Sequence, residues 1–213
     1  MKNALLILGM CWMIPGMTKA QENAADTRDR VVFGAKAGLN YSNVYDSQGE
    51  GFQASPKVGL AAGVFMSLPI GKFIGIQPEA LISQKGFSST GTLLGDNYSM
   101  TRTTTYLDIP LLFALKPSKF VTLLVGPQFS YLMHQTDAFT NGTTSVLQQQ
   151  AFENDNPRKN ILGFTCGIDI TIQHLVLGAR AGWDVQNNNG DGTASTPRYK
   201  NVWYQATIGF RLY

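Results

Sequence analysis

The chain has 213 residues, of which 15% are charged and 44% hydrophobic, and its mean hydropathy is −0.06. Beyond the first twenty positions, no run approaches the roughly 18 apolar residues of a membrane-spanning helix, which argues against a helical membrane protein. Low charge without such a helix predicts a β-rich protein whose apolar residues are spread by alternation.

The first twenty residues have the pattern of a cleaved secretory signal. Lys2 gives a positive start, residues 4–15 form an apolar core, and Thr18 and Ala20 place small side chains at the −3 and −1 positions before Gln21. Cleavage after Ala20 removes two of the 17 lysines and arginines, which leaves 15 basic and 14 acidic residues and a net charge of +1. This balance gives no electrostatic case for binding nucleic acid.

Two other interpretations of this segment are disfavoured. A lipoprotein signal at Cys11 has the bulky Met10 before the cysteine, and a membrane anchor would need a longer apolar run. Signal cleavage leaves Cys166 as the one cysteine, so no intrachain disulfide is expected. Residues 21–30 are polar and lack periodicity, which predicts a flexible lead-in.

From residue 31 onward, apolar residues alternate with small or polar ones. In 31–42 the odd positions include Val31, Phe33 and Tyr41, whereas the even positions include Lys36 and Asn40. This period of two is typical of a strand with one apolar face. The same pattern predicts strands at 57–68, 73–85, 102–115, 121–131, 162–170, 175–184 and 202–212. We therefore expect residues 31–213 to form a closed up-and-down antiparallel transmembrane β-barrel of about eight strands.

The connections between these strands alternate in length. Short connections fall at 69–72, 116–119 and 173–174, and long polar ones fall at 43–55, 87–100, 134–158 and 186–199. Short periplasmic turns and long outer loops are typical of outer-membrane barrels. This sorting places the protein in the outer membrane with both termini periplasmic.

The composition of the two strand faces distinguishes a membrane barrel from a soluble one. A soluble lipocalin-like barrel points its apolar face inward around a ligand. Here the other face carries regular glycine, which would weaken strands on a soluble exterior but suits a crowded lumen. Outward aromatics near strand ends predict interfacial girdles: Phe33, Tyr41, Phe113, Tyr131, Trp183, Tyr204 and Phe210. The apolar face is thus expected to contact lipid.

The inward face also carries charges of both signs. A buried charge must be paired, because an unpaired one costs several kcal/mol. We therefore expect a structural ion-pair network in a filled lumen, made by Lys36, Glu79, Asp108, Asp169, Arg180 and Arg211. The alternative is a path for protons or ions, which an eight-stranded barrel filled by side chains disfavours. Lys57, Lys85 and Arg102 lie higher and are expected to be solvated rim charges.

Three prolines fall within predicted strands. Pro78, Pro110 and Pro127 cannot donate a ladder hydrogen bond, and a closed barrel has no spare edge to receive them. Each should therefore mark a bulge or a local break. Their similar heights on three consecutive strands predict one shared kink low in the barrel wall.

The same segments carry a family resemblance. The motifs are Gly38-Leu39-Asn40, Gln77-Pro78-Glu79-Ala80 followed by Ser83-Gln84-Lys85-Gly86, the segment 106–112 (YLDIPLL), and Gly126-Pro127-Gln128. In their order and spacing, they resemble the PorT-like outer-membrane β-barrel family of Bacteroidetes over nearly the whole mature chain. The resemblance implies an integral outer-membrane barrel. The family's namesake serves a protein-secretion machine, so an accessory role in protein secretion is an alternative function, although no residue here singles it out.

The sequence contains few residues in patterns typical of catalysis or ligand binding. No zinc, nucleotide or nucleophile motif is present, and we expect no catalytic residue, cofactor or metal. An outer-membrane enzyme with a rim site near His134, with Ser130 and Asp137 close in sequence, is the contrasting hypothesis, and a diffusion porin is disfavoured by strand number. We expect a non-enzymatic barrel that contacts lipid and binds a protein partner through its outer loops, chiefly 134–158. The oligomeric state stays open.

Overall fold

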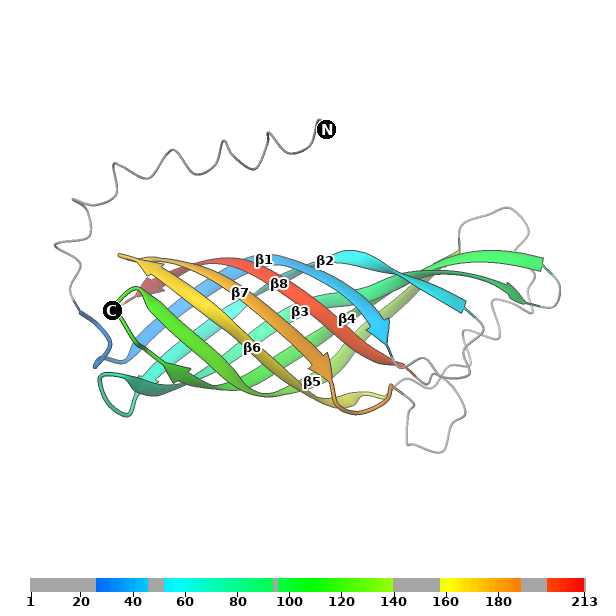
Figure 1. The fold of residues 1–213 in the computed structure, drawn as a ribbon. Coiled ribbons are helices and arrows are strands. Elements are labelled where there is room, and N and C mark those ends of the chain that lie inside the picture. Colours follow the sequence, from blue (N-terminus) through cyan, green and yellow to red (C-terminus); the bar gives the residue numbers. More distant parts are fainter. Residues whose placement is uncertain (1–25, 46–51, 94–95, 140–157, 189–198, 213) are drawn as a thin grey trace, which may run out of the picture.

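The computed structural model describes residues 26–45, 52–93, 96–139, 158–188 and 199–212, and these form a closed antiparallel barrel (Figure 1). Each strand pairs with the next, and β8 pairs with β1. The strands are β1 (Val32–Tyr45), β2 (Phe52–Pro69), β3 (Ile74–Leu93), β4 (Asp96–Leu115), β5 (Val121–Phe139), β6 (Asn160–Ile172), β7 (Leu175–Asp184) and β8 (Lys200–Leu212). The predicted fold class is confirmed. The described part of the chain holds no helix that is long and apolar enough to span a membrane.

Some expectations fall outside the described residues. The expected signal segment 1–20 and residues 140–157 of the expected recognition loop are among them. Residues 26–30, part of the expected flexible lead-in, form a turn at the start of β1, and Thr27 is buried there. This short segment is therefore folded against the barrel.

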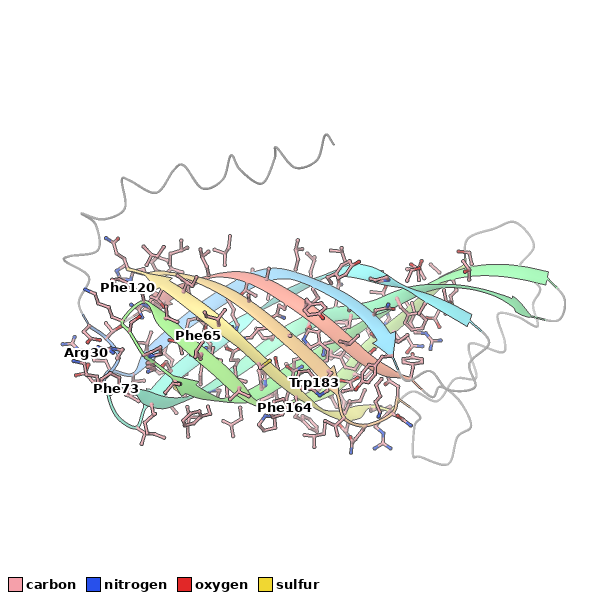
Figure 2. All side chains as sticks on the ribbon, viewed as in Figure 1. Arg30, Phe65, Phe73, Phe120, Phe164 and Trp183 are labelled. Atoms are coloured by element: carbon pink, nitrogen blue, oxygen red, sulfur yellow. The ribbon has the colours of Figure 1, made fainter. Side chains whose placement is uncertain are left out.

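The two faces of the wall follow the alternation of the sequence. Along β1, Lys36 and Asn40 are buried, whereas Phe33, Leu39 and Tyr41 are exposed. The large apolar side chains therefore point outward on the wall that faces lipid. Figure 2 shows Phe73 and Phe120 at the end with short turns, and Phe164 and Trp183, whose rings are 5.4 Å apart, towards the other end.

Several strands run further than their hydrophobic pattern predicted. Segment 87–100, expected to be a loop, continues β3 to Leu93 and begins β4 at Asp96. The added residues include Ser88, Ser89 and Thr101, which are polar on both faces of the strand. Hydrophobic alternation ends along these added residues, although the backbone pairing continues to Leu93 and Asp96. The period-two signal therefore underestimates strand length beyond the membrane.

A bulge in β5 reverses which of its residues face inward. Thr105 pairs with His134 and Tyr106 pairs with Leu132, so Met133 is the extra residue. Below this bulge Gln128 and Ser130 are buried, whereas above it Gln135 and Asp137 are the partly buried ones. The expectation that His134 begins a loop is wrong, because it lies within β5 and points outward.

The three prolines interrupt the ladders without shifting their register. Pairing is lost opposite Pro78 between β2 and β3, opposite Pro110 between β3 and β4, and opposite Pro127 between β4 and β5. Pro78 pairs with Leu111 on its other side, so the interruptions lie at neighbouring heights. The expected local breaks are confirmed, whereas the register shifts of the barrel lie elsewhere, between Pro56 and Ala61 and at Thr105/Tyr106.

Two glycines permit close contacts between strands. A Cβ on Gly63 would lie 2.0 Å from the Ala80 carbonyl oxygen, and one on Gly86 would lie 2.0 Å from the Arg102 carbonyl oxygen. Gly86 also has a φ of +152°, which L side chains rarely adopt. Both positions therefore require glycine for reasons of backbone packing.

We predict that Gly63→Ala destabilises the barrel by about 1–3 kcal/mol, because the added methyl group meets backbone that must shift. Gly71→Ala is the matched control, since nothing lies within 4 Å of a Cβ at that turn position. Urea unfolding of both variants in phospholipid vesicles checks this expectation. Equal midpoints for the two variants would contradict it.

Candidate functional site

The lower lumen contains four charged side chains from four strands. Glu79 of β3 forms an ion pair with Lys36 of β1 and lies 3.5 Å from Arg180 of β7. The Arg180 guanidinium donates to both oxygens of Asp169 on β6, at 2.7 and 2.9 Å. Two cations thus face two carboxylates across the barrel, and Gln77 donates to Glu79 and Asp169. These charges neutralise one another through direct side-chain contacts.

A second layer surrounds Lys85. Its ammonium lies 2.9 Å from an Asp108 carboxylate oxygen and 3.7 Å from the centre of the Trp203 ring. Ser130 donates a 2.6 Å hydrogen bond to the same carboxylate. Lys85 was expected to be a solvated rim charge, and this is wrong because it is fully buried. Its parity with Glu79 and Ser83 along β3 was the signal that it faces inward.

Amides and hydroxyls bridge the lumen between β1, β3 and β8. The Asn40 amide donates to the Ser83 hydroxyl at 2.8 Å, and Gln205 donates to the Asn40 oxygen at 2.9 Å. Nearby, the Asp184 carboxylate accepts from the backbone and side-chain nitrogens of Asn201. These bonds fill the space between the charged layers.

The outer mouth is closed by an ion pair and a small apolar cluster. Arg102 donates to both Asp137 oxygens at 2.8 and 2.7 Å, and to the Tyr199 hydroxyl at 3.1 Å. Tyr199 packs with the other members of the cluster, which are Val44, Phe87 and Met100. Arg102 was expected to be solvated, and this is wrong. Of the three expected rim charges, Lys85 and Arg102 are buried, whereas Lys57 is half-buried.

The inner mouth is covered by the segment before β1. Arg28 bonds Asp26 through its side chain, and the Lys116 ammonium donates to the Arg28 carbonyl oxygen at 3.3 Å. Because Arg28 donates to the Asp26 carboxylate, the pKa of this carboxyl lies well below its usual range. Arg211, expected in the lumen network, is half-buried at this mouth and donates to the Gln173 carbonyl oxygen at 2.9 Å.

The residues considered for catalysis do not converge. Ser130 is buried in the lumen, whereas the His134 ring points outward and lies 2.9 Å from the Thr136 hydroxyl. Asp137 faces inward and binds Arg102. Met133, the extra residue in the bulge, separates the faces of Ser130 and His134. Among the described residues, no three His, Cys, Asp or Glu side chains are placed to hold a metal ion.

Residues 19–209 match the family model described as outer membrane protein beta-barrel domain. The chain belongs to this family. The protein is therefore an integral outer-membrane β-barrel, as the outward apolar wall requires. No curated protein matches the chain.

Solved structures with a similar fold come from several bacteria. The Ail protein of Yersinia pestis is 10% identical, with 85% of this chain and 98% of that chain covered and a TM-score of 0.44. Neisserial surface protein A is 9% identical, with 84% and 96% covered and a TM-score of 0.48. OprG from Pseudomonas aeruginosa is 12% identical, with 86% and 95% covered and a TM-score of 0.41.

Lys85→Met should lower the free energy of unfolding by about 3–5 kcal/mol, because it leaves the Asp108 carboxylate buried without its cation. Lys72→Met is the control. Its ammonium is exposed and 3.5 Å from Asp26, so its loss should cost less than about 1 kcal/mol. Urea unfolding in vesicles compares the two variants, and similar losses for both would be inconsistent with a buried pair.

The layered lumen should not conduct ions. Side chains cross it at the Lys36–Glu79, Lys85–Asp108 and Arg102–Asp137 pairs. The first two pairs are buried, and in the third the Asp137 side chain is 15% exposed. Planar-bilayer recordings of the purified full chain should therefore show no steady open-channel current. A stable single-channel conductance would overturn this expectation.

Proposed function

We propose that this protein is a non-catalytic outer-membrane barrel that binds a protein partner by strand addition at the edge of β5. The observation that carries this proposal is a sheet that extends past the barrel at the end opposite the short turns. Strands β3 and β4 remain paired as far as Leu93 and Asp96, whereas β7 ends at Asp184 and β6 begins at Asn160 (Figure 1).

The extended sheet has two edges, and among the described residues only the β2 edge carries groups that block strand addition. At the β2 edge, pairing with β1 ends at Lys57, and Pro56 lies next to a register shift. Proline and bulges are devices that block strand addition. At the β5 edge, ladder pairing with β6 ends at Tyr131, and the Leu132 nitrogen still donates to the Lys159 carbonyl oxygen at 2.7 Å. The described residues from His134 to Phe139 pair with β4 alone. This segment contains no proline and offers backbone groups to another strand.

The β5 edge is held rigidly. Arg102 of β4 lies directly opposite Asp137 of β5, and its guanidinium bonds both carboxylate oxygens. This bidentate pair fixes β5 against β4 beyond the membrane wall. A pre-ordered edge loses less conformational entropy when a partner strand is added.

The outward face of this extension carries threonine and histidine side chains. Thr103 lies opposite Thr136, and Thr105 lies opposite His134. Threonine favours strands and forms cross-strand contacts without apolar patches. Backbone hydrogen bonds with small polar side chains beside them suit recognition of an extended polypeptide segment.

The partner can be captured by a photocross-linking amino acid placed at Thr136 in living cells. We expect one specific adduct at this position, and none from the same amino acid at Tyr204, which is exposed on the barrel wall. With the cross-linking amino acid kept at position 136, Gln135→Pro should weaken the adduct, since proline removes one donor and disturbs the edge. Equal labelling at Thr136 and Tyr204 would contradict the proposal.

A secretion accessory of the PorT-like kind is the second candidate, and the motif residues described above favour it. Pro78, Pro110 and Pro127 interrupt three successive ladders, so these motifs have a structural role in the barrel wall. The shared motifs therefore support a common barrel type. The identity of the adduct distinguishes the candidates, because a secretion component captured at Thr136 would favour the accessory role and an unrelated protein would reject it.

A further inference from the structure

The inner mouth of the barrel holds a small polar cavity beside a buried lysine. The cavity has a volume of about 40 Å³ and is lined by residues that include Thr27, Arg28, Lys116, Ser118, Thr171 and Arg211. Such a volume accommodates a group the size of about two or three water molecules. Lys116 is 5% exposed, although it lies just beyond the end of β4.

Lys116 has cations for neighbours and no acidic partner. Its ammonium donates to the Arg28 carbonyl oxygen at 3.3 Å, and among the described residues no carboxylate lies within ion-pair distance of it. Burial lowers the pKa of Lys116, and the positive charges of Arg211 and Arg28 lower it further. A buried lysine without a carboxylate partner would be stabilised by an anion from outside the chain.

The nearest carboxylates already have partners. Asp169 lines the same cavity, but both its oxygens accept from the Arg180 guanidinium. Asp26 is bound by Arg28 at 2.8 Å and approached by Lys72 at 3.5 Å. Neither carboxylate compensates the charge of Lys116.

Hydroxyl groups complete the lining. The Ser118 oxygen accepts from the backbone nitrogens of Phe120 and Val121 at 3.3 and 3.2 Å, which leaves its hydrogen available to donate. Thr27 and Thr171 also line the cavity and are buried. An ammonium with several hydroxyl donors is a set of groups that binds tetrahedral oxyanions.

We propose that this inner-mouth cavity binds a phosphate group, with the Lys116 ammonium as its principal ligand. The phosphate belongs either to inorganic phosphate or to a phospholipid headgroup at the membrane surface. Its charge offsets the buried Lys116 and stabilises the segment 26–30 at the mouth.

The test measures binding of inorganic phosphate to the purified full chain by isothermal titration calorimetry in a phosphate-free detergent. We expect saturable binding that Lys116→Met weakens by about tenfold or more. Lys159→Met is the control, because that lysine is exposed on the opposite end of the barrel. Comparable affinity in Lys116→Met and the unaltered chain would overturn the proposal.

Two lipid environments identify the source of the phosphate. In nanodiscs of a phosphate-free glycolipid, added phosphate should bind in either case. In nanodiscs of phosphatidylglycerol, binding persists if free phosphate is the ligand and is blocked if the headgroup occupies the cavity. Absence of binding in both the glycolipid discs and detergent would refute the site.

A second measurement does not depend on whether Lys116→Met folds. The urea midpoint of the unaltered chain should rise in phosphate relative to chloride at matched ionic strength, because a ligand that binds the folded state stabilises it. The retained cation of Lys116→Arg should preserve this rise. An unchanged midpoint of the unaltered chain at saturating phosphate would count against the proposal.

Discussion

The structure depends on one constraint, which is that an eight-stranded barrel encloses a narrow lumen that side chains fill, and the charged side chains among them must be paired. Glu79 is one example of this pairing. Its carboxylate forms ion pairs with both Lys36 and Arg180, and so links β1, β3 and β7. Lys36, Lys85 and Arg180 each have a carboxylate within ion-pair distance, so the desolvation cost of these pairs is largely offset. The same pairs that hold the strands together also close the interior.

The wall accommodates this filled lumen by local departures from an ideal sheet. Glycine at Gly63 and Gly86 lets backbones approach more closely than any side chain allows. Pro78, Pro110 and Pro127 remove ladder bonds at adjacent heights while the register is kept. One extra residue, Met133, turns Asp137 inward to meet Arg102. The bulge thus supplies the carboxylate that closes the outer mouth.

The two ends of the barrel have different properties. At the outer end the wall continues as a sheet whose β2 edge is blocked by Pro56 and whose β5 edge is open over the described residues. At the inner end the segment before β1 covers a cavity with excess positive charge near Lys116. The proposed protein contact at one end and the proposed anion site at the other are compatible, because the charged layers of the lumen lie between them.

The sequence alone determined the fold class, the outward apolar face and the inward position of Lys36, Glu79, Asp108, Asp169 and Arg180, since period-two alternation encodes which side of a strand meets lipid. Tertiary structure decided how far β3 and β4 continue beyond the lipid, where alternation ends and pairing does not. It also decided the partners of Lys85 and Arg102. Their burial depends on side chains from β4, β5 and β8 that converge only when the sheet closes. Contacts across a lumen join residues far apart in the chain, and no local pattern records them.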